Sequence, residues 1–452
     1  MTRRRTGRTL RVACVALLLS VPPSAAAAGL LDVYDAALAA DTRLQAATSG
    51  VAAAKERERE AFGAWLPRLT ATASVERARR DDRDNSTGGD DGAREFTREQ
   101  YQLQLTQPIY DRANWVRERQ ASHETRHREL ELLGERQDLV MRVTEAYFDV
   151  LLAELDRNLA QREVEALEGE RRRVLALYER ELASVADERE VEAALAQAHS
   201  ELARSEHRLE AAHEGLREIT AQRFPALRPL GDDVSLEPPT PDDVDSWVDR
   251  AMANNPRLRA IQAAHSGRRD QVSLERAGHH PRLELFAGLS YFDDVDDEPD
   301  MPMGTTGRRF DETAVGLRLT VPLYEGGRVG ARSRAAQAEL TQLQQQMDGF
   351  RRALKSNVRS SFLDIQRGMT AVRALERSVE AEETRLSAVE RELELGRRSV
   401  VDVLDARRNR FEARLALAQA RTEYLGAHVA LLATTGELDR ETMQWLDDLL
   451  ED

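Results

Sequence analysis

A zinc-binding motif is the first feature of this sequence that could carry out chemistry. His123-Glu124-Thr125-Arg126-His127 has the form H-E-x-x-H, in which two histidines on one helix face can bind zinc while the glutamate acts as a base. The surrounding tract is rich in Glu and Arg, and the sequence offers no evident third ligand. We therefore expect no metal site here, and no enzyme activity.

An acidic cluster is the second candidate for chemistry. Its members are Asp293, Asp294, Asp296, Asp297, Glu298 and Asp300. Carboxylates of this kind can bind Ca²⁺, but a run so rich in Asp is equally typical of a solvated loop, which is the reading we favour. No phosphate-binding glycine loop, Ser–His–Asp arrangement or basic stripe is present, and the net charge is −15. These observations predict no cofactor and no nucleic-acid partner.

The amino terminus is typical of a cleavable signal peptide, residues 1–28. Five arginines precede a short apolar run, Val12 to Val21, and small residues, Ala25 to Ala28, then predict cleavage before Gly29. The alternative is a short membrane anchor. Cys14 lies at the start of the apolar run, so the chain does not look like a lipoprotein. Cleavage would remove this only cysteine and change the net charge from −15 to −20.

Short sequence patterns recur at one spacing, which predicts an internal duplication. Pro67-Arg68-Leu69 returns as Pro281-Arg282-Leu283, and Gln107 to Asp111 aligns with Val321 to Glu325, both at an offset of 214 residues. A proline-rich stretch separates the two halves. The predicted segments are a first repeat at 29–223, a linker at 224–241, a second repeat at 242–436 and a C-terminal acidic segment at 437–452.

Each repeat contains two segments in which apolar and polar residues alternate. They lie at about 67–76, 100–110, 281–292 and 312–323. Alternation over this length predicts β-strands. A proline, Pro108 or Pro322, is expected to end the second strand of each repeat, because it has no N–H for the ladder. Gly326 and Gly327 then let the chain turn sharply into a helix.

Long helical tracts follow the strands, at 112–222 and 328–436. Their apolar residues keep helical spacing, as in Val143, Tyr147 and Val150. Helices of this length must pack as coiled coils. The fold class is therefore mainly α with a small β part.

Four strands of about ten residues can each cross a bilayer as part of a β-barrel, but they cannot close one, since barrels begin at about eight strands. Charged residues make up 32% of the chain and mean hydropathy is −0.56, which argues against a polytopic helical membrane protein. Two interpretations remain. The sheet is water-soluble on a helical stalk, or several chains share one barrel, three of them giving twelve strands.

Three motifs in this order resemble the TolC family of outer-membrane channel proteins. They are Leu105 to Asp111, Val321 to Gly327, and Val401-Asp402-Val403-Leu404-Asp405-Ala406. The resemblance covers about residues 30–436. It implies a homotrimer with a twelve-stranded β-barrel in the outer membrane, continued by a long periplasmic α-helical barrel of coiled coils.

The resemblance also implies a gate at the periplasmic end of the tunnel. The matching residues are Asp402, Asp405, Arg398 and, in the first repeat, Asp187. Asp402 and Asp405 are three residues apart and share a helix face, so threefold symmetry would form carboxylate rings that favour cations. The alternative is that they are solvated surface acids or, for Asp402, a helix cap.

Two residues depart from the family pattern near this gate. Glu181 stands where the family usually has glycine, and Leu393 where a gating tyrosine can be found. The bonds of the closed state are therefore expected to be rearranged.

The implied function is the outer-membrane exit channel of a tripartite export system, for type I protein secretion or small-molecule efflux. The implied partners are an inner-membrane transporter, driven by ATP or protons, outer-membrane lipid, and a periplasmic adaptor that contacts the helical tips at Ser184, Gly396, Arg397 and Ser399. Absence of a lipoprotein cysteine favours the type I secretion branch. The alternative function is a periplasmic coiled-coil structural or adaptor protein with a soluble β-domain.

Overall fold

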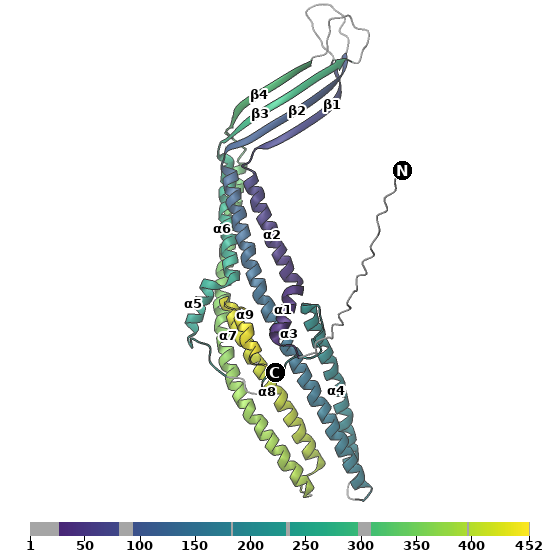
Figure 1. Ribbon diagram of the computed structural model, residues 1–452. Helices are drawn as coiled ribbons and strands as arrows, with labels where there is room; N and C mark the ends of the chain where they lie inside the picture. The colour runs from purple at the N-terminus through teal and green to yellow at the C-terminus, as the bar shows by residue number, and fades with distance from the viewer. Residues whose placement is uncertain are drawn as a thin grey trace, which may run out of the picture. The chain divides into compact units, whose positions relative to one another are not determined.

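The computed structural model describes residues 27–80, 94–181, 184–231, 236–296, 309–395 and 397–451. These residues are mostly helical, with one antiparallel sheet (Figure 1), which confirms a mainly α fold with a small β part. The predicted signal peptide lies outside the described residues, apart from Ala27 and Ala28. Across the described ranges, no helix combines the length and the apolar character needed to cross a membrane.

The described chain forms two compact units. One comprises residues 27–39, 146–231 and 443–451, and the other comprises residues 40–145 and 236–442. Helix α3 (Arg112–Tyr178) contributes to both. The larger unit holds the whole sheet and most of the long helices.

The sheet has the strand order β1-β2-β3-β4, and all neighbours are antiparallel. Its strands are β1 (Arg68–Arg80), β2 (Arg94–Asp111), β3 (Arg282–Asp296) and β4 (Arg309–Thr320). The register places Tyr101 opposite Tyr291, and Leu103 opposite Leu289. Because side chains alternate along a strand, this register puts the leucines, the tyrosines Tyr101 and Tyr291, and most other apolar residues of the four strands on the same face.

Pro108 does not end its strand as the sequence suggested. Pro108 lies inside β2, and the register shifts between Pro108 and Tyr110, so that Ile109 forms a bulge. A bulge accommodates a residue that cannot donate to the ladder, which is why the strand continues to Asp111. In the second repeat β4 ends at Thr320, and Pro322 follows the strand.

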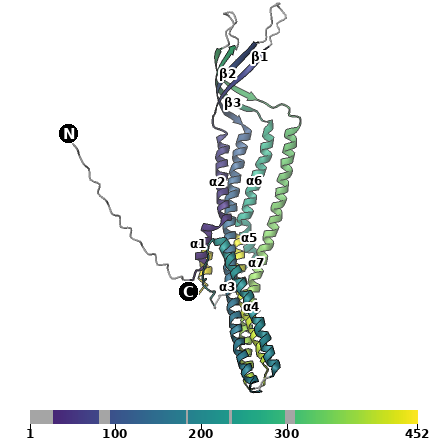
Figure 2. The same ribbon diagram turned by 90° about the vertical axis from the view of Figure 1, so that its right-hand side faces the viewer.

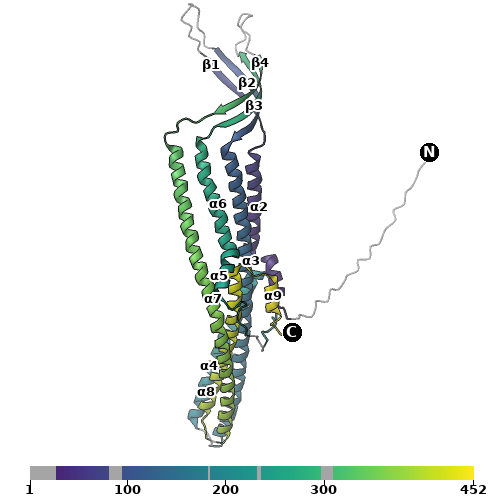
Figure 3. The same ribbon diagram turned by 90° about the vertical axis from the view of Figure 1, so that its left-hand side faces the viewer.

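Each strand of the sheet connects directly to a helix of the same unit. The helices are α2 (Thr42–Gly63), the first part of α3, α6 (Pro256–Arg276) and α7 (Arg328–Glu394). Side-chain contacts join them in this order: Lys55–Glu129, Gln120–Gln271 and Arg268–Glu339. Figures 2 and 3 show the four helices side by side, in the order of the strands they join. The sheet and the helical layer are therefore one continuous structure.

Helices α7 and α8 (Val400–Thr435) form an antiparallel hairpin. Three Arg–Glu ion pairs cross it: Arg407–Glu390 at 2.9 Å, Arg414–Glu383 at 2.9 Å from Nε, and Arg421–Glu376 at 3.2 Å. Successive pairs are seven residues apart on both helices, which is the repeat of a coiled coil. Leu386, Val389, Val403 and Ala406 pack together in the same hairpin. We call the three ion pairs the arginine ladder.

The remaining helices are α1 (Leu30–Ala40), α4 (Val185–Thr220), α5 (Val244–Asn254), the 3-10 turn η1 (Ala277–His279) and α9 (Arg440–Asp447). The two repeats begin their second helix with equivalent caps. Asp41 accepts a hydrogen bond from the Leu44 amide at 2.7 Å, and Asn255 accepts one from the Leu258 amide at 2.9 Å. Such a side chain satisfies a helix N–H that has no backbone partner.

The turn from β4 into α7 depends on two glycines. Gly326 and Gly327 have φ of +61° and +78°, and Gly327 immediately precedes the first residue of α7. A Cβ atom at either position would meet nothing within 4 Å. The left-handed backbone alone therefore requires glycine, because L side chains make that conformation unfavourable.

We expect Gly327→Ala to lower the free energy of unfolding by about 0.5–1 kcal/mol, since the left-handed penalty exceeds the entropy gained in the unfolded chain. Gly349→Ala is the matched control. It lies inside α7, a Cβ there would also meet nothing within 4 Å, and alanine is expected to stabilise the helix by about 0.5–1 kcal/mol. Guanidinium chloride denaturation in detergent measures both. Effects of the same sign would contradict this account of the turn.

Candidate functional site

One face of the sheet is apolar and exposed. Its large side chains are Leu69, Val75, Tyr101, Leu103, Leu289, Val315, Leu317 and Leu319. Their exposed fractions run from 39% to 72%. A continuous apolar face of this size, drawn from four strands, is typical of a surface that contacts lipid or another protein.

The opposite face of the sheet is largely polar, although Phe286, Phe292 and Phe310 also lie on it. Thr70, Gln102 and Gln104 lie on it, together with cross-strand ion pairs. Glu76 pairs with Arg98 at 3.2 Å, and Glu284 pairs with Arg318 at 2.8 Å. The polar groups and ion pairs of this face are suited to contact with water. The two faces of the sheet therefore differ in polarity.

Both edges of the sheet are unpaired within the described chain. β1 bonds only to β2, and β4 bonds only to β3. An exposed strand edge is a template for pairing with another chain. In an apolar medium such an edge cannot remain open, because its amide and carbonyl groups have no water to bond.

An aromatic cluster lies where the sheet meets the helices. Trp115 contacts both Trp65 and Tyr110, with ring centroids 5.8 Å apart in each case. The Trp65 indole also donates to Glu118 at 3.1 Å. Amphipathic aromatic rings concentrate at membrane–water boundaries. Neither tryptophan is predicted as a site residue from the sequence, because Trp65 falls between predicted elements and Trp115 lies in the first turn of a helix. Residue type is the only signal that points to them.

The tip of the α7–α8 hairpin holds a capping box. The Ser399 amide donates to the Asp402 carboxylate at 2.9 Å, and the Asp402 amide donates to the Ser399 hydroxyl at 3.3 Å. Arg398 donates to Glu392 at 2.9 Å and lies 3.5 Å from the other carboxylate oxygen of Asp402. The hydrogen bond from the Ser399 amide, then that from its hydroxyl, and the Arg398 charge hold the pKa of Asp402 below its ordinary value of 3.8.

The tip between α3 and α4 repeats this arrangement in the other unit. The Ser184 amide donates to Asp187 at 2.9 Å, and the Asp187 amide donates to the Ser184 hydroxyl at 3.2 Å. The bond from the Ser184 amide, followed by that from its hydroxyl, lowers the pKa of Asp187. Two of the three predicted gate acids, Asp187 and Asp402, are therefore members of helix-capping boxes, which for Asp402 was the alternative prediction.

Other predicted tip residues have less defined surroundings. Asp405 is exposed, one helical turn after Asp402, and its side chain makes no hydrogen bond or ion pair with a described residue. The Arg397 amide donates to the Glu392 carbonyl at 2.9 Å. Gly396 lies outside the described residues. The structure thus brings Arg398, Ser399 and Asp402 together.

The two departures from the family pattern have distinct physical roles. Glu181 has φ of +60°, and its amide donates to the Tyr178 carbonyl at 2.9 Å, so it closes α3 in the left-handed conformation that glycine adopts most readily. Ala221, with φ of +55°, closes α4 in the same way, and Gly436 occupies the equivalent place after α8. Leu393 packs against the apolar cluster of the α7–α8 hairpin.

The histidines of the zinc-like motif are used in contacts between helices. His123 lies 3.5 Å from Asp270, and His127 is 3.0 Å from the Ala260 carbonyl and 3.1 Å from Glu131. No group of three His, Cys, Asp or Glu side chains that could hold a metal occurs within the described ranges. In the acidic cluster, Asp293 accepts a hydrogen bond from Tyr291 at 3.1 Å, and residues 297–300 lie outside the described residues.

Comparison with known proteins identifies a family. The profile of the outer membrane efflux protein family matches residues 33–222 and again residues 247–437. The chain is 26% identical over 415 residues to the outer membrane protein TolC of Vibrio cholerae, with 92% of each chain covered. It is 27% identical over 432 residues to the alkaline protease secretion protein AprF of Pseudomonas aeruginosa, covering 95% of this chain and 89% of that relative.

A solved structure supports the same fold. The outer membrane protein VceC of Vibrio cholerae aligns with a TM-score of 0.75 over 90% of this chain and 96% of its own. Sequence identity in that alignment is 17%, so the likeness concerns the fold.

The capping box at Ser399 and Asp402 should depend on pH. A carboxylate whose folded pKa is depressed stabilises the folded state fully above its unfolded pKa of about 3.9, and that stabilisation is lost as pH falls through the lower folded value. Hydrogen exchange of the first α8 turn, measured from pH 7 to pH 3, should show protection that declines only below about pH 4. Asp402→Asn is the control, because asparagine does not titrate. The difference in protection between the wild type and this variant should be constant above about pH 4 and should change only below it. Parallel pH profiles for the two proteins would contradict the assignment.

We expect Glu181→Gly to stabilise the end of α3 by about 0.5–1 kcal/mol, because glycine removes a left-handed penalty of about 1–2 kcal/mol and adds a smaller entropy to the unfolded chain. Glu179→Gly, at a neighbouring position without positive φ, should destabilise it. Hydrogen exchange of the last α3 turn measures both variants. Destabilisation by Glu181→Gly would show that its side chain is needed at the tip.

Proposed function

The chain belongs to the outer membrane efflux protein family, and from this premise we propose that it is the outer-membrane exit channel of a tripartite export system. Its place is the outer membrane, with an extension into the periplasm, and its family is one of channels and not of enzymes. Substrate would pass through it unchanged. The energy for export would come from an inner-membrane transporter driven by ATP or protons.

The apolar face of the sheet is the observation that carries this proposal. Val315, Leu317 and Leu319 are all more than 60% exposed along a single strand. In a water-soluble sheet, contact of these side chains with water would be unfavourable in free energy, and no other interaction would offset it. Facing lipid removes that cost, while the polar face borders an aqueous lumen. The alternative of a periplasmic coiled-coil protein with a soluble sheet leaves this face unexplained.

A homotrimer supplies the missing strands. One chain has four strands and two open edges, which lipid does not tolerate. Three chains, with β1 of one pairing with β4 of the next, would close a barrel of twelve strands with no edge. The three sets of long helices would then continue the barrel as a tunnel. Matches of the family profile to both halves support an origin of the chain by duplication.

The gate is assigned to Asp402, Asp405, Asp187 and Arg398. In a trimer each carboxylate would occur three times around the axis, which favours cations at the entrance. The exposed tips, including Ser184, Gly396, Arg397 and Ser399, would bind a periplasmic adaptor. Similarity to AprF, a protein named for secretion of alkaline protease, supports type I protein secretion as the branch.

Planar-bilayer conductance tests the channel and its gate together. We expect the mature protein to form small cation-selective channels, and Asp402→Asn with Asp405→Asn to lower cation selectivity. Asparagine retains an oxygen that can accept the hydrogen bond from the Ser399 amide, so the helix cap is largely kept while the charge is lost. Glu60→Gln with Glu441→Gln, which removes two exposed carboxylates in α2 and α9, is the charge-matched control and should leave selectivity unchanged.

Two results would contradict the proposal. A mature protein that stays soluble without detergent and is monomeric by light scattering would exclude a shared barrel. If the double variant forms channels with unaltered selectivity, the proposed export function stands, but Asp402 and Asp405 do not line the pore.

A further inference from the structure

The two β-hairpins of the sheet share one register. β1 pairs with β2 so that Arg68 lies opposite Thr106, and β3 pairs with β4 so that Arg282 lies opposite Thr320. Each residue of the second pair follows its counterpart in the first by 214 positions, which is the spacing of the sequence duplication. The sheet is therefore one hairpin used twice, and the β2–β3 pairing joins the two uses.

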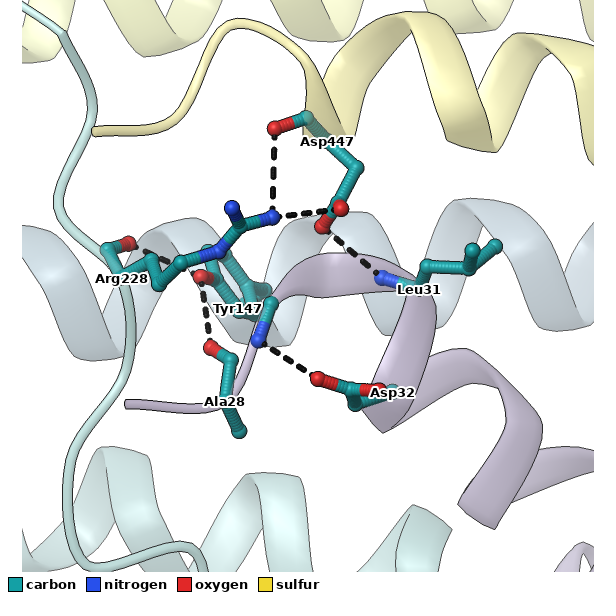
Figure 4. A network of polar contacts seen from close by, with 7 residues as sticks. Ala28, Leu31, Asp32, Tyr147, Arg228 and Asp447 are labelled. Carbon is teal, nitrogen blue, oxygen red and sulfur yellow. Dashed lines mark hydrogen bonds and ion pairs between the residues drawn. The ribbon is translucent and has the colours of Figure 1, made fainter. Parts of the chain in front are cut away.

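The equivalence of the repeats is weaker outside the sheet. In the smaller unit, the Tyr147 hydroxyl donates to the Arg228 carbonyl at 2.8 Å and lies 3.1 Å from the Ala28 carbonyl, beside the ion pair of Arg228 with Asp447 (Figure 4). The counterpart of Tyr147, at an offset of 215, is Phe362, which has no hydroxyl. We therefore transfer contacts from one repeat to the other only within the sheet.

The contact between the two hairpins predicts how the open edges of the sheet can meet those of a second copy. Leu103 of β2 lies opposite Leu289 of β3. The counterpart of Leu103 is Leu317 on β4, and the counterpart of Leu289 is Val75 on β1. A second copy that repeats this contact places its Val75 opposite Leu317. Both side chains are apolar and 66% exposed, so the apolar face continues across this junction, which we call the seam.

Charged residues on the two edges fit this register of the seam. Asp311 becomes the diagonal neighbour of Arg79 in the second copy, and Arg318 becomes the diagonal neighbour of Glu76, within reach of long side chains. A slip of two residues in either direction keeps one of these pairs adjacent and moves the other four residues apart. A slip of one residue would place apolar side chains opposite polar ones. The register transferred from β2 and β3 is therefore the one that brings both pairs of opposite charge together.

On the polar face, the seam would join two ion pairs that each chain already contains. Glu76 pairs with Arg98 at 3.2 Å, and Arg318 pairs with Glu284 at 2.8 Å. Bringing Glu76 of the second copy beside Arg318 lines up four charges of alternating sign across neighbouring strands. Opposite charges in such positions stabilise a pair of strands, whereas like charges destabilise it.

The chain that follows β4 provides a second observation. The last part of β2, residues 107–111, extends past β1 and pairs only with β3. The counterpart of this part, residues 321–325, follows β4 without forming a strand in the single chain. It includes Leu323 and Tyr324, which are 92% and 88% exposed. A second copy would supply the strand that these residues lack.

The same transfer gives residues 321–325 a register. Asp111 lies opposite Arg282, so Glu325 comes to lie opposite Arg68 of the second copy, and an acid again faces a base. Leu323 takes the place of the bulged residue in β2. The start of β1 is exposed and has no strand on its outer side within the described chain, so it can receive this segment.

We propose that β4 of one copy pairs with β1 of a second copy in the register that places Leu317 opposite Val75, and that residues 321–325 continue β4 along this seam. The proposal rests on the shared barrel of the proposed function and specifies how its copies meet. The partner is a second copy of this chain, recognised by backbone hydrogen bonds, apolar side chains on one face and opposite charges on both.

Cysteine cross-linking tests the register on the protein in its membrane. Cys14, the single cysteine of the chain, lies in the predicted signal peptide, so introduced cysteines can be examined one pair at a time. The full chain is expressed in an exporting bacterium, and outer membranes are oxidised with copper phenanthroline before non-reducing electrophoresis. Val75→Cys with Leu317→Cys, and Thr72→Cys with Thr320→Cys, should convert the monomer into covalent dimers and trimers. One pair lies on each face of the sheet, so both classes of antiparallel pair are sampled.

Matched controls exclude other origins of a cross-link. β1 and β4 of one chain are separated by β2 and β3, about 14 Å at the usual strand spacing, which is too far for a disulfide within a chain. Ala71→Cys with Leu317→Cys, and Arg79→Cys with Leu317→Cys, are each four residues out of register and should remain monomeric, as should each single-cysteine variant. Cross-linking of an out-of-register pair in place of the matched pair would overturn the register.

Leu69→Cys with Tyr324→Cys tests the continuation of β4. Tyr110 lies opposite Leu283, so the transferred contact places Tyr324 opposite Leu69 of the second copy, and we expect covalent dimers and trimers. Leu69→Cys with Leu319→Cys is four residues out of register and should remain monomeric. Cross-links at the two strand pairs without one at this position would reject the continuation.

Bilayer conductance of the same variants before oxidation separates this proposal from the proposed function. Channels without covalent oligomers from any matched pair would reject the seam and leave the export channel standing. Absence of both channels and covalent oligomers would reject the two together.

Discussion

Backbone amide and carbonyl groups in a lipid bilayer have no water to bond, and this constraint governs the rest of the molecule. A four-stranded sheet satisfies its interior groups but leaves the outer sides of β1 and β4 unpaired. In the proposed trimer, closing those edges with further copies would also fix the number of helices that follow, because each strand connects directly to one helix. The order α2, α3, α6, α7 repeats the strand order, so the order of the sheet is passed to the helical layer by connectivity alone.

The alternation of apolar and polar residues predicted the strands, and the register explains why it succeeded. Tyr101 opposite Tyr291, and Leu103 opposite Leu289, put the apolar positions of neighbouring strands on one face. The pattern fails near the loop ends of β1 and β2, where Arg77 and Glu99 place charge on the face that is otherwise apolar. The prediction that Pro108 ends its strand was wrong for a different reason. The bulge at Ile109 shifts the register next to the proline, so β2 continues to Asp111.

At the helical tips, the sequence predicts the capping boxes but not the residues in the left-handed conformation. Ser184 with Asp187, and Ser399 with Asp402, have the spacing of a capping box and could have been read as such from the sequence. The left-handed residues Glu181 and Ala221 are less visible, because neither type favours that conformation. Their signal lies in the second repeat, where Gly396 and Gly436 occupy the equivalent places. At Ala221 the first repeat thus adopts, without glycine, the left-handed conformation that Gly436 adopts in the second repeat.

The arginine ladder limits how the α7–α8 hairpin can move. Its three pairs share one offset, so sliding one helix along the other separates all of them at once. The pairing pattern can recur only after a shift of seven residues, about 10 Å at the rise of an α-helix. Each pair is partly exposed and is worth at most about 1 kcal/mol, so the ladder acts through the sum of its members. It therefore favours one alignment of α7 against α8, in which all three pairs form together.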